Sequence, residues 1–469
     1  MKSDELWRLG AATVASGIRK KTFSARDVVT SCVQRYEATH SAINALTEVR
    51  AEDALMAADE ADRAVQAHEA LGPLHGVPVT IKDNVDLEGW ATVNGCAALR
   101  NNIARATSPC VQNWLNAGAI VLGRTNTPEF CCRWETNNDV FGPTRNPWDR
   151  ARTPGGSSGG AAASLAAGVT PLAQGNDLGG SLRQPAQACG IASLRPGIGR
   201  VPVWNPTQPG EPGMGVQMMH VEGPMARRIE DVRLGLRAMV ARDRHDPWWV
   251  PAPLELADAT TVTAALVIDP AGGGVSKQVA SGVERAGKLL EDAGYKVDKI
   301  EPPGIGEAAH IWQVVCLGEL QMGLEPAVKD ICGPALRRTF DCYRAALPRF
   351  DLGMYASAFA RRVGLLRDWL GFFERYGVIV APVGTEPPLE TDGDIASPER
   401  MAAVIHSFRM TIAVNALGLP AAVVPVGVRD GLPQVVQIIG PPFSEMRCLA
   451  VAEAIERQVE PLTPIDPRQ

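Results

Sequence analysis

The sequence has no run approaching the roughly 20 apolar residues that a bilayer span needs, and its start, MKSDE, is too polar and acidic for a secretory signal. These absences predict a cytoplasmic protein without a membrane partner. None of the ten cysteines is in Cys-x-x-Cys spacing, and the seven histidines show no His-Glu-x-x-His pattern, so no zinc site is expected. Because the cysteines are scattered through 469 residues, reduced thiols are favoured over a disulfide framework.

The sequence also lacks the usual signs of nucleic-acid and nucleotide binding. Its formal net charge is −6 and its basic residues are dispersed, which gives no electrostatic footprint for nucleic acid. Its glycine-rich segments are not followed by Gly-Lys-Ser/Thr, and no G-x-G-x-x-G opens a helix, which argues against a phosphate-binding loop. We therefore expect an enzyme without metal or cofactor that acts on a small molecule.

Helical patterns alternate with short apolar runs, which predicts an α/β layered fold. Helices are expected over 25–36, with Ser24 as N-cap, and over 51–70, and a crossover helix over 276–293. Strands are expected at 77–81, 119–122, 263–268, 297–300, 377–383 and 421–426. The Pro- and Gly-rich segment 195–215 is interpreted as a long ordered loop near the site.

Two serine motifs are the most informative feature. Ser157 lies in TPGGSSGG (153–160), and Ser181 lies 24 positions later in NDLGGSLRQPA (176–186). One such glycine cluster alone would be typical of a flexible linker, but the second carries its own Asp177, Arg183 and Pro185. Upstream, VPVTIKDN (77–84) places Lys82 after an apolar run, as expected for a lysine at the buried end of a strand.

These residues suggest nucleophilic catalysis. A serine hydroxyl needs a base within hydrogen-bond reach, and no histidine lies in a recognisable triad motif. Lys82 can serve as base for Ser181 only when neutral, which requires burial or neighbouring groups to lower its pKa. The backbone N–H groups of Leu178, Gly179, Gly180 and Ser181 are predicted to converge on the oxyanion of a tetrahedral intermediate.

The order Lys82, Ser157, Ser181 resembles the amidase signature family, and further segments look like family segments: LGPLHGVP (71–78), GRTNTPEF (123–130), FGPTRNPW (141–148), GRV (199–201), EGPMAR (222–227), NALGLP (415–420) and QIIGPP (437–442). The resemblance implies a single α/β/α domain over 1–469, with a mixed twisted sheet covered by helices on both faces. Its expected parts are N-terminal helices at 1–70, a catalytic core at 71–235, a variable substrate-pocket segment at 240–400 and a C-terminal core segment at 401–469.

The resemblance also implies roles for individual residues. A cis bond is expected between Gly156 and Ser157, with Ser157 passing a proton between Ser181 and Lys82. Asp177, Arg183 and Ser158 are expected to support the site. The loop at Cys131, Cys132 and Arg133 is expected to border the substrate, with Trp312, Cys316 and Met322 as further pocket candidates, although core packing explains these apolar residues equally well. Asn137, Asn176 and Gly197-Ile198 depart from the family pattern, which leaves substrate preference open.

The sequence therefore predicts a cofactor-independent hydrolase of carbon–nitrogen amide bonds that forms a Ser181 acyl-enzyme. Aryl amides, carbamates, hydrazides and esters share this chemistry and are not separated by the sequence. The alternative is the glutamine-hydrolysing subunit of a tRNA-dependent amidotransferase, which would need partner proteins. A binding protein without catalysis is disfavoured because Lys82, Ser157 and Ser181 are all present. Whether the chain forms a homodimer is left open.

Overall fold

The strands of the protein form one mixed sheet that runs through the middle of the molecule. The computed structural model describes residues 3–255 and 262–468, and in these the sheet has 11 strands in the order β1-β3-β2-β4-β6-β5-β10-β11-β9-β7-β8. The strands are β1 (Leu46–Val49), β2 (Pro78–Lys82), β3 (Ile120–Thr125), β4 (Leu172–Asp177), β5 (Ala192–Arg195), β6 (Val221–Ala226), β7 (Ala264–Leu266), β8 (Val297–Lys299), β9 (Val378–Pro382), β10 (Ala421–Arg429) and β11 (Leu432–Ile439).

The register of the sheet brings distant parts of the chain together. β2 runs parallel to β3 on one side and to β4 on the other, whereas β4 runs antiparallel to β6. At the other end of the sheet, β7 is parallel to both β8 and β9. All residues of β2, β4 and β6 are buried, as expected for strands covered on both faces.

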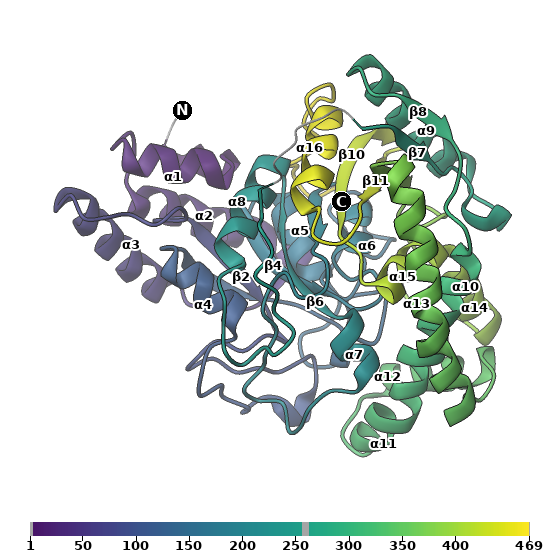
Figure 1. Cartoon of the computed structure of the whole chain (residues 1–469). Coiled ribbons are helices and arrows are strands. Elements are labelled where there is room, and N and C mark those ends of the chain that lie inside the picture. Colours follow the sequence, from purple (N-terminus) through teal and green to yellow (C-terminus); the bar gives the residue numbers. More distant parts are fainter. Residues whose placement is uncertain (1–2, 256–261, 469) are drawn as a thin grey trace.

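Helices cover both faces of this sheet (Figure 1). The helices are α1 (Ala11–Arg19), α2 (Ala25–Ile43), α3 (Ala51–Gln66), α4 (Pro109–Asn116), α5 (Gly159–Ala167), α6 (Arg183–Cys189), α7 (Met214–Met219), α8 (Ile229–Met239), α9 (Lys277–Asp292), α10 (Ile305–Trp312), α11 (Glu325–Val328), α12 (Pro334–Ala346), α13 (Leu352–Arg375), α14 (Pro398–Ser407), α15 (Arg409–Leu417) and α16 (Glu445–Glu456). Short helical turns are η1 (Ser3–Arg8), η2 (Ala97–Leu99), η3 (Glu129–Cys131), η4 (Pro270–Gly272), η5 (Gln313–Leu317) and η6 (Leu320–Leu324). α8, α16 and α9 pack side by side, while α5 and α6, whose residues are all buried, form the helical layer next to the two serine motifs.

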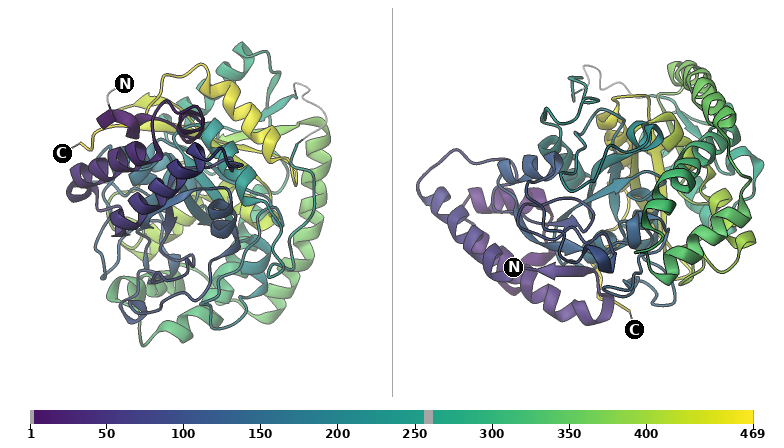
Figure 2. Two further views of the ribbon diagram at one scale, coloured as in Figure 1. Left: turned by 90° about the vertical axis from the view of Figure 1, so that its left-hand side faces the viewer. Right: turned by 90° about the horizontal axis from the view of Figure 1, so that it is seen from below.

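The two ends of the sheet carry different helical groups. α1, α2 and α3 lie beyond the β1 end, and the long helix α13 lies at the opposite side of the molecule, as both views of Figure 2 show. A second apolar core joins α10, η5, α13 and α15, separate from the main core under β2, β4 and β10. No described helix combines the length and the apolar character that crossing a membrane would require.

The predicted fold class is confirmed, and each predicted strand corresponds to an observed one. Ser24 caps α2 as expected: its hydroxyl accepts the Asp27 N–H, and the Asp27 carboxylate accepts the Ser24 N–H. α9 begins at the capping residue Ser276 and connects the parallel strands β7 and β8. Met1 and Lys2, the start of the polar N-terminal segment, lie outside the described residues.

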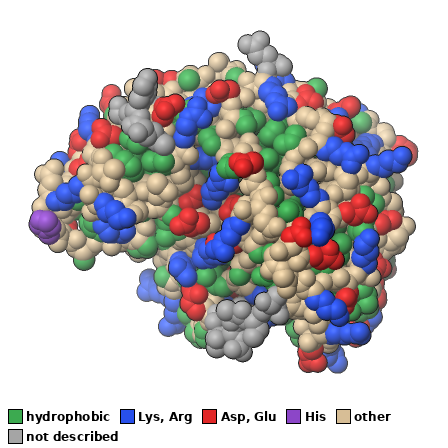
Figure 3. Space-filling model, turned by 90° about the horizontal axis from the view of Figure 1, so that it is seen from above, with side chains coloured by type: hydrophobic (Ala, Val, Ile, Leu, Met, Phe, Trp, Pro, Cys, Tyr) green, Lys and Arg blue, Asp and Glu red, His purple; other side chains and the backbone are tan. Residues whose placement is uncertain are grey.

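Charged side chains are mixed over the surface. Basic and acidic groups alternate over the face drawn in Figure 3, in keeping with the dispersed charge of the sequence.

Candidate active site

Lys82 ends β2 inside the protein. Its side chain is fully buried, and its Nζ donates hydrogen bonds to Ser157 Oγ at 2.6 Å and to Asn176 Oδ1 at 2.7 Å. Burial lowers the pKa of Lys82, while the neighbouring Cys131 thiol and the Glu222 carboxylate act in the opposite direction. The structure thus brings together two of the three residues that the sequence predicted, 75 positions apart in the chain.

Ser157 lies in a tight segment just before α5. The Gly156–Ser157 peptide bond is cis, as the family resemblance implied. A Cβ at Gly156 would lie 2.6 Å from the Glu135 nitrogen, so only glycine fits against this backbone. Thr127 Oγ1 donates to the Ser157 carbonyl at 3.0 Å, and Ser158 Oγ donates to the Asn176 carbonyl at 3.4 Å. These contacts hold the Ser157 backbone in place while its hydroxyl faces Lys82.

The second serine motif forms a turn between β4 and α6. Asp177, at the end of β4, accepts hydrogen bonds from the N–H groups of Gly180 and Leu182 and from the Arg183 guanidinium. Burial by itself would raise the pKa of Asp177, but Arg183 and Arg195 overcome this effect and hold that pKa well below its ordinary value. The turn is therefore built around a buried ionised carboxylate, the bracing role expected for Asp177 and Arg183.

The turn presents three free amides beside Ser181. The N–H groups of Leu178, Gly179 and Ser181 make no hydrogen bond to the residues that the structure describes. The Gly180 N–H differs because it donates to Asp177 Oδ1 at 2.9 Å. This corrects the sequence-based expectation that all four amides face the oxyanion: the Gly180 amide is engaged in holding the turn.

Ser181 itself is 9% exposed, and its hydroxyl has no hydrogen-bond partner within residues 3–255 and 262–468. A buried amine bound to one serine, and a second serine in a turn with free amide groups that follows the Lys82 partner Asn176, are the components for acyl transfer. The arrangement needs no metal ion for this chemistry.

Two indoles hold the carbonyl side of the same turn. Trp134 Nε1 donates to the Gly179 carbonyl at 2.9 Å, and Trp312 Nε1 donates to the Leu178 carbonyl at 2.8 Å. Phe408 stacks on Trp134 with ring centroids 5.4 Å apart. Trp312 was a predicted pocket residue, whereas Trp134 and Phe408 were missed. Trp134 directly follows the predicted loop 131–133, but Phe408 carries no sequence signal that would separate it from an ordinary core residue.

The other predicted pocket residues fall into different places. Cys131 lies at the site, since its thiol contacts Lys82 and lies 3.3 Å from Thr127 Oγ1. Cys132 packs against the small apolar cluster under α12. Cys316 is buried in the second core, where its Sγ contacts Met219. Met322 is 59% exposed on η6.

Arg133 is held by three carboxylates. Its guanidinium is nearly fully buried and bonds to Asp394 at 2.6 Å, to Asp392 at 2.9 Å and to Glu135 at 3.3 Å. These carboxylates raise its pKa further despite burial. Arg133 thus joins the 131–135 loop to the 392–394 segment through ion pairs, while its Nη1 has no hydrogen-bond partner within the described residues. Its place at the substrate stays a prediction.

The loop after β5 lies next to Lys82, as predicted. Asn205 Nδ2 donates to the Asn84 carbonyl at 3.1 Å, two residues beyond Lys82, and Asn205 Oδ1 accepts the Asp86 N–H. These bonds fix the loop to the segment that follows Lys82.

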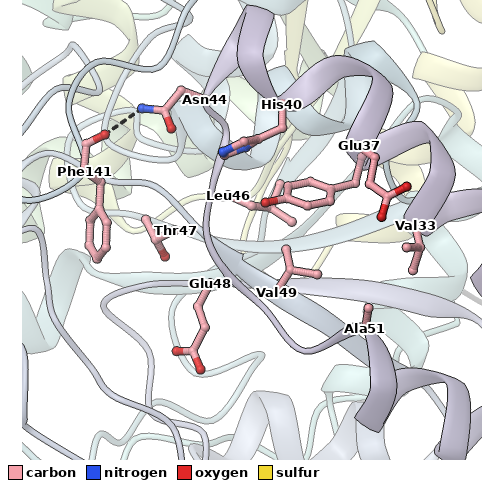
Figure 4. Close-up of a pocket in the computed structure, with 11 residues that line it drawn as sticks. Val33, Glu37, His40, Asn44, Leu46, Thr47, Glu48, Val49, Ala51 and Phe141 are labelled. Atoms are coloured by element: carbon pink, nitrogen blue, oxygen red, sulfur yellow. Dashed lines mark hydrogen bonds between the residues drawn. The ribbon is translucent and has the colours of Figure 1, made fainter.

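A separate surface cavity of about 380 Å³ lies away from these residues, between α2 and β1. Tyr36, His40 and Glu48 are among its lining side chains, and Asn44 on its rim donates to the Phe141 carbonyl at 2.7 Å (Figure 4). It contains none of the predicted catalytic residues. Within the described parts of the chain, no group of three or more His, Cys, Asp or Glu side chains could hold a metal ion.

Comparison with known proteins adds the family context. A family model described as Amidase matches residues 27–449. The chain is 40% identical to an indoleacetamide hydrolase of Bradyrhizobium diazoefficiens over 97% of this chain and 87% of that protein. It is 31% identical to a glutamyl-tRNA(Gln) amidotransferase subunit of Moorella thermoacetica over 97% of this chain and 98% of that protein. Among solved structures, a bacterial aryl acylamidase of the amidase signature family superposes with a TM-score of 0.82 at 26% identity, covering 97% of this chain and 96% of the other.

Proposed function

Because this chain belongs to the amidase family and hydrolyses carbon–nitrogen amide bonds, we propose that its substrate is an arylacetamide of the indoleacetamide type and that Ser181, Ser157 and Lys82 carry the reaction. The hydrogen bond between Lys82 Nζ and Ser157 Oγ is the observation that supports these roles most directly. Lys82 also bonds to Asn176, which directly precedes the turn that carries Ser181 and the three free amides. The 40% identity to an indoleacetamide hydrolase supports the substrate class.

The first half of the reaction forms an acyl-enzyme. Ser181 Oγ attacks the amide carbonyl while its proton passes to Ser157, whose own proton passes to neutral Lys82. The oxyanion accepts hydrogen bonds from the N–H groups of Leu178, Gly179 and Ser181. When the intermediate collapses, the proton returns through Ser157 to the leaving nitrogen, and ammonia departs.

The second half releases the acid. Water enters the position that ammonia vacated, and Lys82 takes its proton through Ser157 as the water attacks the acyl carbonyl. Collapse of the second tetrahedral intermediate returns a proton to Ser181 Oγ and frees the carboxylic acid. The net reaction consumes one water and gives one acid and one ammonia, with the protein unchanged.

The aromatic surroundings of the turn support an aryl substrate. Trp134 and Trp312 donate hydrogen bonds to carbonyls of the turn, and Phe408 stacks on Trp134. Aromatic side chains bind flat apolar rings through stacking and edge contacts. The amidotransferase alternative has weaker support, since the matched amidotransferase protein is 31% identical to this chain, against 40% for the indoleacetamide hydrolase.

A substrate panel tests this proposal. We expect kcat/KM for indole-3-acetamide to exceed that for acetamide by about 100-fold, because burying one aromatic ring contributes roughly 3 kcal/mol. Ammonia release is measured from indole-3-acetamide, phenylacetamide, acetamide, a nitroanilide and glutamine. Preference for glutamine would contradict the proposed substrate and favour the amidotransferase alternative.

The adjacent serines 157 and 158 offer a matched pair for the proton relay. We expect Ser157→Ala to lower kcat by about 100- to 1,000-fold, because it interrupts proton transfer between Ser181 and Lys82. Ser158→Ala removes only a 3.4 Å bond to the Asn176 carbonyl and should cost less than about tenfold. Steady-state kinetics of both variants check this difference, and equal losses would show that Ser157 has no relay role.

A further inference from the structure

A buried glutamate that neither serine motif contains lies behind Lys82. Glu222 is 3% exposed and sits on β6 directly opposite Asn176 on β4 in the antiparallel register. Its Oε2 accepts a hydrogen bond from Gln174 Nε2 at 2.5 Å, and its Oε1 accepts one from Asn176 Nδ2 at 3.5 Å. Buried carboxylates are rare unless they have a partner, so this residue requires an explanation.

The carboxylate fixes the orientation of two side-chain amides. An ionised carboxylate only accepts hydrogen bonds, whereas an amide has a donating nitrogen and an accepting oxygen. Asn176 therefore turns its Nδ2 toward Glu222 and Asn84 Oδ1, and its Oδ1 toward Lys82 Nζ. Gln174 likewise turns its Nε2 to Glu222 and its Oε1 to the Lys82 backbone N–H at 3.0 Å. Both amides thus present oxygen to Lys82.

This orientation decides where the Lys82 lone pair points. A neutral lysine amine has two N–H bonds and one lone pair. In the structure Nζ donates to Ser157 Oγ at 2.6 Å. When Lys82 is neutral and one of its N–H bonds is held by Asn176 Oδ1 at 2.7 Å, this contact can reverse, so that the Ser157 hydroxyl donates to the lone pair. If Asn176 were flipped, its Nδ2 would donate into that lone pair and compete with Ser157. The acceptor that prevents the flip is Glu222.

The charge of Glu222 also acts on Lys82. Burial raises the pKa of Glu222 to about 7, and Lys82 acts in the opposite direction, as do the bonds from Asn176 and Gln174. Above this pH Glu222 is ionised, so it then carries its negative charge and only accepts hydrogen bonds. In turn, burial lowers the pKa of Lys82, and the Glu222 carboxylate raises it. The two groups face each other across Asn176, so a change of charge on one is felt by the other.

The other charged or titratable neighbours do not cancel the influence of the Glu222 charge on Lys82. His220 Nε2 lies 3.6 Å from Glu222 Oε1, but burial and then Lys82 lower its pKa to about 4, so it is neutral at neutral pH. Burial raises the pKa of Cys110, on α4, well above its ordinary value, and its thiol stays neutral. Asp177 is paired with Arg183 and Arg195. Cys131 contacts Lys82 from the η3 side.

We propose that Glu222 is a positioning residue of the amidase reaction, which orients Asn176 so that the Lys82 lone pair faces Ser157 and whose negative charge stabilises protonated Lys82. This inference rests on the proposed role of Lys82 as the base. It assigns to β6 a part in catalysis through Asn176, since the hydrogen bonds that the Glu222 carboxylate accepts within the described residues come from Gln174 and Asn176 and not from the serines.

The isosteric variant Glu222→Gln tests the proposal. We expect kcat for indole-3-acetamide to fall about tenfold with little change in KM, because the amide side chain no longer forces Asn176 into one orientation. Removing the negative charge disfavours protonated Lys82, so the rise of kcat with pH should move about one unit toward lower pH. A profile that coincides with that of the unchanged protein would overturn the proposal.

Two further variants separate positioning from general loss of structure. In an Asn176→Ala background, Glu222→Gln should cause no further fall in the plateau value of kcat at high pH, because the residue that it orients is gone, whereas the shift of the pH profile, which comes from its charge, should remain. Glu445→Gln alters another buried glutamate, which is held by Arg200 at 3.0 Å. This control should lower the unfolding temperature without shifting the pH profile. Equal shifts at 222 and 445, or additive effects of 176 and 222 on the plateau value of kcat, would contradict the proposal.

The failure of this inference differs from failure of the proposed catalytic roles. If Lys82→Met loses activity while Glu222→Gln keeps the original pH profile, Lys82 is the base and Glu222 has no positioning role. If Lys82→Met keeps most of the activity, the proposed base is wrong and the role of Glu222 falls with it.

Discussion

Replacing Ser181 by alanine is expected to lower kcat for amide hydrolysis on the order of 10⁴-fold or more, because no other group can form the acyl-enzyme. Binding and the free amides of the turn would remain, so KM should change little. Hydrolysis of indole-3-acetamide and the burst of nitrophenol from a nitrophenyl ester both measure this step, and the burst should vanish in the variant.

The stability of the Ser181→Ala variant separates chemistry from folding. Because the Ser181 hydroxyl has no hydrogen-bond partner among the described residues, its removal should leave the unfolding temperature unchanged. Ser164→Ala is a suitable control, since Ser164 is buried in α5 and its hydroxyl donates to the Ala161 carbonyl. That control should keep full activity. Substantial turnover by Ser181→Ala would rule out this serine as the nucleophile.

Replacing Lys82 by methionine is expected to lower kcat/KM on the order of 10³-fold, because methionine has a similar length but cannot accept a proton. Lys82 acts as a base only when neutral, and burial lowers its pKa. Activity of the unchanged protein should therefore rise with pH as Lys82 loses its proton, and fall as pH drops below that pKa. Measuring kcat/KM against pH checks this, and the rise of kcat/KM with pH should be absent in Lys82→Met.

The same lysine links pH to stability. Its pKa is lower in the folded than in the unfolded protein, so the unfolded chain binds more protons between the two values. The contribution of Lys82 to the free energy of unfolding thus rises as pH increases through this window. Denaturant unfolding at several pH values should show a shallower rise for Lys82→Met. An unaltered slope together with full activity would mean that Lys82 is protonated and has no catalytic role.

The motifs of the candidate active site were predictable because their signals are local. The apolar run before Lys82 indicated a buried strand end, and β2 ends at Lys82. Gly156 and Gly180 mark backbone positions where the fold leaves no space for a side chain or requires a positive φ. Ser24 and Ser276 are also local signals, because each lies at the N-cap of a helix and its side chain accepts a backbone N–H of the first turn.

Several strands next to the site were not predicted. β4 reads LAQGND and β6 reads VEGPMA, and Gly, Pro, Asn and Asp disfavour strands when judged locally. They form strands because β4 pairs with β2 on one side and with β6 on the other. The backbone hydrogen bonds formed by this pairing stabilise both strands despite their unfavourable local propensity.

The sequence alone determined which groups are available and in which order: a lysine at a strand end, two serines in glycine-rich turns, and an aspartate and arginine beside the second. Only the tertiary structure decided which charges are paired and which are free. Arg133 is bound by carboxylates from the 392–394 segment, the Gly180 amide is taken by Asp177, and Glu222 is placed against Asn176. The physical reason is that burial and hydrogen bonding between segments far apart in the chain set the charge and direction of each group, and neither can be read from neighbouring residues.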